Sequence, residues 1–454
     1  METASNLHLD GTSLSLVWSL PFVGLLFSIA ILPLLARHFW EHHFGKVASF
    51  WALAFLVPCA LVFGIATTTL ETLDALLLDY LPFIILLFAL FVVAGGIKVS
   101  SNLVGTPMTN TAMLTLGTLS ASIIGTTGAS MVLIRPMIEA NQDRRRKVHI
   151  FVFFIFLVAN IGGSLTPLGD PPLFLGFIKG VDFFWVTKAM FAPMMILSAS
   201  LLLVFYLIDQ LAWRQEADKI KRQSHAPRHI RIEGLHNVLY LGLVVGAILA
   251  SGLWDPAIGV PIGFGLSMPL DGLARDVTLL LVSYLSWKTT KLSIRVENAF
   301  TWVPIQEVAI LFAAIFITIV PALAVLRAGT DGALAPLLVL VSAPDGTPIE
   351  GAYFWMTGLL SSFLDNAPTY LVFFNLAGGD AEKLMGPLAH TLLAISMSAV
   401  FMGALTYIGN APNFMVRSIC EERGIKMPSF FVYMLWSGAI LLPLFAVLTL
   451  VFFI

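Results

Sequence analysis

Two stretches of this chain repeat one another. Residues 163–172 read Gly-Ser-Leu-Thr-Pro-Leu-Gly-Asp-Pro-Pro, and residues 403–412, 240 positions later, read Gly-Ala-Leu-Thr-Tyr-Ile-Gly-Asn-Ala-Pro. They share the pattern G-x-L-T-x-[LI]-G-[DN]-x-P, whose glycines and polar residues interrupt otherwise apolar segments. General hydrophobicity would not produce this string twice. The pattern therefore predicts an internal repeat in which each copy contains one broken helix.

A polar hairpin tip precedes each copy at the same distance. Thr126 lies 44 residues before Asp170, and Asn366 lies 44 residues before Asn410. Each tip separates two short apolar runs that are together too long for one membrane span and too short for two, so we expect re-entrant hairpins buried within protein. The two hairpins are expected at residues 110–140 and 351–378.

The composition restricts the class of protein. Of the 454 residues, 58% are apolar and 11% are charged, and the mean hydropathy is +0.90, whereas soluble domains carry about 25% charged residues. This indicates an integral membrane protein and excludes a soluble enzyme. The 25 Lys and Arg are balanced by 27 Asp and Glu, which excludes a nucleic-acid binder. The two cysteines, Cys59 and Cys420, predict neither a disulfide framework nor a metal site.

Hydrophobic length predicts the spans, because about 20 apolar residues cross the hydrocarbon core. Two segments, 149–178 and 388–420, are long enough to cross but are interrupted near their middle by Gly, Pro and polar residues. We interpret them as broken helices. Residues 276–287 form a short, marginal span. The uninterrupted spans are expected at residues 16–36, 49–69, 79–98, 185–211, 236–254, 303–326 and 429–454.

These segments predict an all-α polytopic membrane protein built from an inverted repeat. The first repeat covers residues 1–211, a cytoplasmic linker covers 212–235, and the second repeat covers 236–454. Each half has five crossing segments and one hairpin, and because five is odd the second half enters the membrane from the opposite side. Inverted repeats with broken helices are typical of secondary transporters. A duplicated channel or structural protein is the alternative.

Basic residues predict the orientation, since cytoplasmic loops retain Lys and Arg. One topology puts 20 of the 25 basic residues inside, including Arg144–Lys147, and places the N-terminus outside. We interpret the basic clusters as a topology signal and expect a multi-pass protein of the cell's inner (plasma) membrane. Residues 1–11 contain no Lys or Arg, so the basic region of a signal peptide is missing and the first apolar segment is expected to be retained.

The breaks and tips carry the candidate cation- and proton-binding residues, and none of these is basic. Two carboxylates with several hydroxyl and amide oxygens suit Na⁺, Li⁺ or H⁺. Asp170 belongs to a broken helix whose symmetry mate is Asn410, while Asp365 belongs to a hairpin whose mate position is Thr126, so folding the halves together would bring both acids to one central cavity. The set comprises Asp170, Asp365, Asn366, Asn410, Thr166, Thr406, Thr126 and Thr127, with Asp170 and Asp365 as the metal-ion ligands.

The two acids suggest a mechanism. An ionised carboxylate at the bilayer centre is costly, so it should be protonated or cation-bound at any instant. The alternative is that each acid only caps a half-helix. Glu307 is a candidate proton relay or an interfacial acid, and we interpret His390 and Arg135 as interfacial residues.

At these motifs the chain resembles the ion transporter superfamily, which holds NhaD-type sodium:proton antiporters, arsenite permeases and citrate or dicarboxylate transporters. The resemblance is sharpest at residues 125–130, 160–172 and 361–368, and the last two are similar to the antiporters. It implies that Asp170, Thr166, Asp365 and Asn410 are cation-coupled, and that the protein is a homodimer of scaffold and transport domains. Dicarboxylate members carry Ser-Asn-Thr at both hairpin tips, and this chain lacks that motif. The antiporters often have an acidic residue near the first tip, and this chain has none there.

The sequence therefore predicts a Na⁺(Li⁺)/H⁺ antiporter. The alternative is a cation-coupled citrate, dicarboxylate or oxyanion transporter of the same superfamily, and a passive ion channel is a third hypothesis. We expect no cofactor besides the transported Na⁺, Li⁺ and H⁺, and no partners other than these ions, the lipid bilayer and a second subunit. The sequence has no H-E-x-x-H motif, nucleophile elbow or phosphate-binding loop, so a membrane enzyme is disfavoured.

Overall fold

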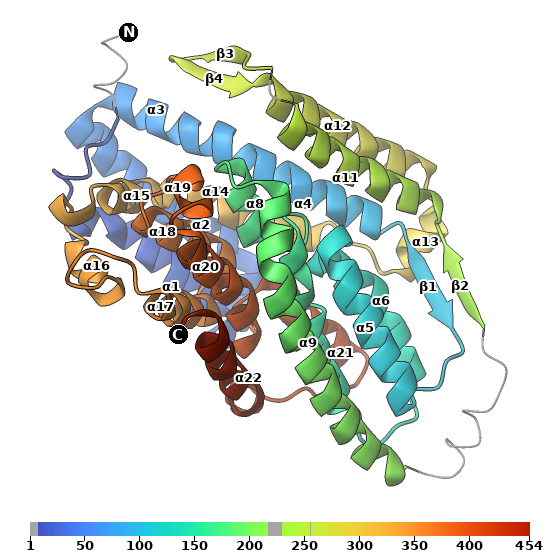
Figure 1. Ribbon diagram of the computed structural model, residues 1–454. Helices are drawn as coiled ribbons and strands as arrows, with labels where there is room; N and C mark the ends of the chain where they lie inside the picture. The colour runs from blue at the N-terminus through green and yellow to red at the C-terminus, as the bar shows by residue number, and fades with distance from the viewer. Residues whose placement is uncertain (1–7, 217–228, 255) are drawn as a thin grey trace.

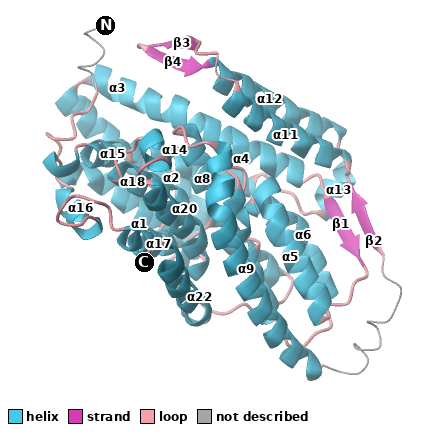
Figure 2. Cartoon of the chain, viewed as in Figure 1, coloured by secondary structure: helices cyan, strands magenta, loops and turns pink. Residues whose placement is uncertain are grey.

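A computed structural model describes residues 8–216, 229–254 and 256–454. Helices dominate this part of the chain (Figures 1 and 2), which confirms the all-α fold class. Residues 217–228 of the predicted linker lie outside the described residues. Two antiparallel ribbons supply the strands of the described part: β1 (Lys98–Ser101) with β2 (Ile230–Glu233), and β3 (Gly259–Gly263) with β4 (Leu266–Pro269).

The described residues contain 7 helices that are long and apolar enough to cross a membrane. An eighth candidate is the pair α14 (Val303–Thr318) and α15 (Val320–Arg327), bent by 41°. The protein is therefore a multi-pass membrane protein. The seven are Leu16–Leu35, which includes α1 (Leu20–Leu35); His38–Phe63 in α2 (Arg37–Phe63); Ile65–Ala94, which joins α3 (Ile65–Asp74) to α4 (Leu81–Ala94); Val148–Leu165; α9 (Phe183–Arg214); α11 (His236–Leu253); and α22 (Phe430–Phe452).

Some span boundaries differ from the prediction. The span expected at 49–69 ends instead at Gly64, whose φ of 89° interrupts the helix. The next helix begins at Ile65, well before the predicted start at residue 79. The Thr, Glu and Asp residues of this segment lower its hydropathy, but they are helical. The expected loop at 37–48 is helical as well. The marginal span at 276–287 belongs to a longer helix, α12 (Leu270–Thr289).

Two helix pairs, each followed by an interrupted helix, occupy residues 107–178 and 350–422, and their insertion in a membrane as re-entrant hairpins stays a prediction. In the second half as in the first, a short helix pair precedes a helix that stops, passes through a 3-10 turn and restarts (Figure 1). In the first half these elements are α5 (Pro107–Ile124), α6 (Thr126–Ala140), α7 (Val148–Leu157), η4 (Ile161–Leu165) and α8 (Pro171–Ile178). In the second half they are α17 (Glu350–Phe363), α18 (Asn366–Leu376), α20 (Ala389–Phe401), η6 (Met402–Leu405) and α21 (Ala411–Glu422). The described residues also include the short helices α13 (Leu292–Glu297), α16 (Ala335–Val341) and α19 (Ala381–Met385).

Equivalent hydrogen bonds hold each hairpin to its break. The Ser122 hydroxyl donates to the Gly162 carbonyl, and the Ser362 hydroxyl donates to the Met402 carbonyl. The Thr166 hydroxyl donates to the Ser122 carbonyl, and the Thr406 hydroxyl donates to the Ser362 carbonyl. Both pairs of bonds are related by the 240-residue shift, which supports the repeat. The opposite orientation of the two halves in the membrane stays a prediction.

Glycines allow the chain to cross itself closely at each break. A Cβ added at Gly169 would lie 2.0 Å from the carbonyl oxygen of Gly163, and one at Gly409 would lie 2.6 Å from that of Gly403. No side chain fits at these distances. Gly169 and Gly409 of the repeated motif are therefore required by the backbone approach.

Two groups of helices meet at the breaks. Helices α1, α2 and α14 pack together, and α11 and α12 pack on α4, which runs along them in Figure 1. The hairpin α5–α6 packs on η4 and α9, while α17 and α18 pack on α20. Helix α4 contacts both α6 and α8, so it joins the two groups where the chain breaks.

Candidate functional site

Four helix N-termini converge on the side chain of Asp170. Asp170 is the N-cap of α8 and Asn410 is the N-cap of α21, while Thr126 and Asn366 are the first residues of α6 and α18. The other three residues all donate hydrogen bonds to the Asp170 carboxylate. The hairpins and breaks of both halves thus meet at one carboxylate.

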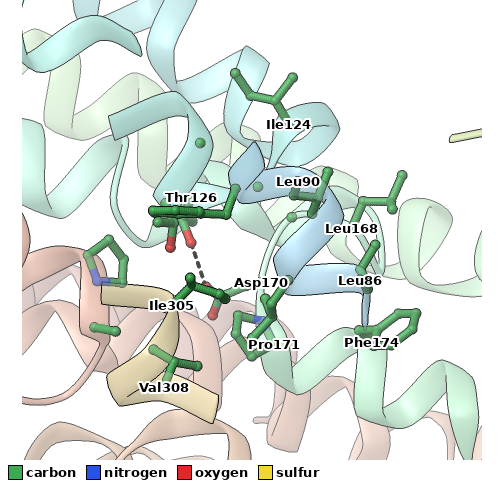
Figure 3. A pocket seen from close by; sticks show the side chains of 18 of the residues that line it. Leu86, Leu90, Ile124, Thr126, Leu168, Asp170, Pro171, Phe174, Ile305 and Val308 are labelled. Carbon is green, nitrogen blue, oxygen red and sulfur yellow. Dashed lines mark hydrogen bonds between the residues drawn. The ribbon is translucent and has the colours of Figure 1, made fainter. Parts of the chain in front are cut away.

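The carboxylate of Asp170 is held by neutral donors. Thr126 Oγ1 and Asn410 Nδ2 each donate to Oδ1 at 3.0 Å, and Asn366 Nδ2 donates to Oδ2 at 2.5 Å. Figure 3 shows the bond from Thr126 at the edge of a cavity. Asp170 is only 1% exposed. Its charge is therefore removed from water with no cationic side chain among these donors.

A chain of amides extends from this carboxylate to both breaks. Asn410 Nδ2 also lies 3.2 Å from the Ala159 carbonyl oxygen and 3.4 Å from Asn160 Oδ1. Asn160 Nδ2 donates to Asn413 Oδ1 at 2.7 Å, and Asn413 Nδ2 donates to the carbonyls of Gly403 and Thr406 at 2.9 Å each. These bonds fix the orientation of Asn410 toward Asp170.

Two buried oxygens near the hairpin tips have no hydrogen-bond partner among the described residues. They are Oδ1 of Asn366 and Oγ of Ser130, and both side chains are 0% exposed. An unpaired buried polar atom costs about 1–3 kcal/mol. The amide nitrogen of Asn366 donates to Asp170, so the unpaired oxygen belongs to a side chain in direct contact with the carboxylate.

A cavity of about 90 Å³ opens beside Asp170. Its walls come from α4, α6, α8, α14 and α21, and they are mainly apolar (Figure 3). The polar side chains among the described residues that line it are Thr126, Thr127 and Asp170, and no Lys, Arg or His lines it. The cavity is an apolar chamber with one carboxylate in its wall.

The second predicted acid has a different role in the structure. Asp365 is half-buried, and its Oδ1 accepts a 3.1 Å hydrogen bond from the backbone N–H of Ala367, so it caps α18. It interacts electrostatically with Asp170 but does not line the cavity. The residue of this hairpin that contacts Asp170 is Asn366, one residue later, whose spacing in the repeat matches that of Thr126.

The other predicted residues divide into structural and peripheral ones. The hydroxyls of Thr166 and Thr406 donate hydrogen bonds to backbone carbonyls of the hairpins and not to Asp170. Glu307 accepts a 3.0 Å hydrogen bond from the Trp40 indole on α2 and does not line the cavity. His390 is exposed at the start of α20.

One buried network was missed by the sequence analysis. Asp209 accepts hydrogen bonds from Arg144 Nη2 at 2.5 Å, His149 Nε2 at 2.8 Å and Asn110 Nδ2 at 2.9 Å, and all four residues are at most 6% exposed. Interpreting Arg144 only as a topology signal was incomplete, because it ties α9 to the first hairpin. An acid inside an apolar span, as at Asp209, is the signal that would have predicted the network.

The donor chemistry does not resemble a transition-metal centre. Among the described residues no group of three or more His, Cys, Asp and Glu side chains could hold a metal ion. Cys59 and Cys420 are free and buried. The side chains that contact Asp170 are one hydroxyl and two amides.

Comparison with known proteins identifies the family. A family model described as "Putative citrate transport" matches residues 11–453, nearly the whole chain. No curated protein matches the chain. The match agrees with the broken helices and membrane-spanning architecture, and together they indicate a transporter rather than an enzyme. The chain belongs to the "Putative citrate transport" family of membrane transporters.

Proposed function

We propose that the protein exchanges Na⁺ or Li⁺ for H⁺, with the ions competing for Asp170. The observation that carries this proposal is the enclosed carboxylate of Asp170, which meets only neutral hydrogen-bond donors. A lone buried charge is costly, so the carboxylate favours a state in which a proton or a cation neutralises it. Since one carboxylate cannot hold both, each crossing carries one or the other.

The charge balance of the site disfavours a multivalent anion. Each helix N-terminus contributes about half a positive charge, so the four ends that meet here supply about two charges. Asp170 and Asp365, the N-caps of two of these helices, supply two negative charges in return. The chain thus places its own carboxylates where an anionic ligand would otherwise bind. No positive charge is left over for a multivalent anion.

The available ligands suit an alkali metal ion. Oxygen atoms of carboxylates, amides and hydroxyls are the donors that hard cations prefer. Asp170 provides its carboxylate, Thr126 its hydroxyl, and Asn366 the amide oxygen that lacks a hydrogen-bond partner. In our proposal these atoms form part of the cation's coordination shell.

A carboxylate carrier is the second candidate, and the family description favours it. Helix N-termini bind carboxylates readily, and cations at Asp170 and Asp365 would supply the missing positive charge. In that case transport of citrate would depend on Na⁺, and Na⁺ alone would not move protons.

The test is a pH-gradient dye assay in everted vesicles. We expect Na⁺ and Li⁺, but not K⁺ or citrate, to dissipate the gradient through the wild-type protein, and Asp170→Asn to abolish the response. Asp380→Asn is the matched control, because Asp380 is a surface N-cap of α19 whose function Asn retains. Full activity in Asp170→Asn would overturn the proposal, and Na⁺-dependent uptake of labelled citrate without proton movement would establish the alternative.

The orientation and assembly belong to the same proposal. We place the protein in the cell's inner membrane with its N-terminus outside, following the basic loops, and as a homodimer, following the superfamily resemblance. Cysteine labelling from each side of the membrane tests the first point, and mass measurement in detergent tests the second.

A further inference from the structure

We infer that the cavity beside Asp170 accepts a small organic cation of the quaternary ammonium type and exchanges it for a proton. This inference rests on the proposed cation chemistry of Asp170 and extends its substrate class. It follows from the size, the walls and the charge of the cavity.

The cavity is larger than an alkali metal ion requires. A single water molecule needs a cavity volume of about 10–15 Å³, whereas this cavity measures about 90 Å³. A bare Na⁺ at the carboxylate would leave most of this volume unused. The remaining space fits a compact organic group.

The cavity walls disfavour water as the filling. Leu86 and Leu90 on α4, Val308 on α14 and Phe174 on α8 face the space (Figure 3). Apolar cavities hold water poorly and bind apolar groups instead. A ligand with a hydrocarbon surface would therefore be favoured over hydrated ions.

Aromatic rings add an attraction for positive charge. Phe83, Phe91 and Phe174 all line the cavity. The face of an aromatic ring attracts ammonium groups by about 0.5–2 kcal/mol, and quaternary ammonium ligands are commonly recognised in this way. Neutral solutes would gain nothing from either the rings or the carboxylate.

The charged and polar groups of the cavity determine the charge and the chemical type of the ligand. Asp170 is the charged side chain in the described lining, and Thr126 and Thr127 are its remaining polar side chains. An anion would meet the carboxylate unshielded. A quaternary ammonium has no N–H group, so it needs no further acceptors and leaves no donor unpaired in the apolar part of the site.

The exchange is balanced in charge and atoms. The O–H bond of protonated Asp170 breaks, the proton passes to water on one side, and the organic cation takes its place beside the carboxylate. On the other side the cation leaves and a proton from water restores the O–H bond. One positive charge moves in each direction.

Everted vesicles with tetramethylammonium chloride test this inference. Tetramethylammonium has no deprotonated form, so it cannot collapse a pH gradient by crossing the lipid as a weak base. We expect it to dissipate the gradient through the wild-type protein and to compete with Na⁺. In Val308→Trp, which fills the cavity, we expect the half-maximal tetramethylammonium concentration to rise at least tenfold in a protein that melts at the wild-type temperature in detergent.

A matched control is available on the same helix. Ile310 is 42% exposed and does not line the cavity, so Ile310→Trp should respond to tetramethylammonium like the wild type. Absence of both a tetramethylammonium response and competition with Na⁺ would overturn the inference, and so would an unchanged response in Val308→Trp. If the wild type responds to Na⁺ but not to tetramethylammonium, the proposed antiport stands. If it responds to tetramethylammonium but not to Na⁺, Na⁺ is overturned as the substrate and the organic cation is supported.

Discussion

The side-chain amide of Asn366 donates a 2.5 Å hydrogen bond to Asp170, although 196 residues separate them in the chain. This bond joins the tip of the second hairpin to the break of the first half. The amide oxygen of Asn366 has no hydrogen-bond partner, and in our proposal it is an acceptor for the cation.

Replacing Asn366 should weaken cation binding. Asn366→Ala removes the donor and the free oxygen together, and we expect the half-maximal Na⁺ concentration to rise at least tenfold, which corresponds to about 1.4 kcal/mol. Asn375→Ala, on the same helix but bonded to Arg327, should change it less than threefold. Equal effects of the two substitutions, measured in the vesicle dye assay, would contradict a direct role for Asn366.

The two acids should respond differently to the same substitution. Asp365 caps α18 through the N–H of Ala367, and Asn is as good an N-cap as Asp, whereas Ala costs about 0.5–2 kcal/mol. We therefore expect Asp365→Asn to keep at least a tenth of the exchange rate and the wild-type melting temperature, and Asp365→Ala to melt earlier. Complete loss of exchange in a well-folded Asp365→Asn would mean that this acid also binds the ion.

The close glycines of the break should not tolerate a methyl group. In Gly169→Ala the new Cβ would lie 2.0 Å from the Gly163 carbonyl oxygen, so the break must shift and Asp170 with it. We expect exchange to fall by at least tenfold. Gly242→Ala is the matched control, because no atom lies within 4 Å of its new Cβ, and helical Ala should if anything raise stability. Wild-type exchange in Gly169→Ala would refute the close approach.

The network around Asp209 should contribute to stability rather than to exchange. Asp209→Ala removes the closer of two carboxylates beside the buried Arg144 and leaves only Glu216, at 3.8 Å, and breaking a buried pair costs about 3–5 kcal/mol. We expect a clear fall in the melting temperature in detergent. His149→Gln should have a smaller effect, since Arg144 and Asn110 still satisfy Asp209. An unchanged melting temperature in Asp209→Ala would show that the network is dispensable.

The internal repeat made the core of the site predictable from sequence. The matching spacings of Thr126, Asp170, Asn366 and Asn410 predict that hairpins and breaks meet, and these four residues form the hydrogen-bonded centre. The role of Asp365 could not be predicted in the same way. Whether residue 365 or 366 faces the centre depends on where α18 begins, and a shift of one residue turns a helical side chain by about 100°.

The parts that hydropathy alone could not predict involve polar residues within helices. The start of α3 at Ile65 was missed because Thr, Glu and Asp residues lower its apparent hydropathy, although they are helical. The buried pair of Arg144 and Asp209 was missed because basic residues next to spans normally mark the cytoplasmic side. An acid within a span signals a buried partner for Asp209, whereas the identity of that partner depends on tertiary contacts.

The most direct test of the central claim is proton release on cation binding by purified protein in weakly buffered detergent solution. If Na⁺ and H⁺ compete for Asp170, adding Na⁺ at a pH where the site is protonated should release up to one proton per protein, and raising the pH should lower the half-maximal Na⁺ concentration. Asp170→Asn should release none. Sodium binding without proton release by the wild type, or unchanged release by Asp170→Asn, would contradict competition at this carboxylate.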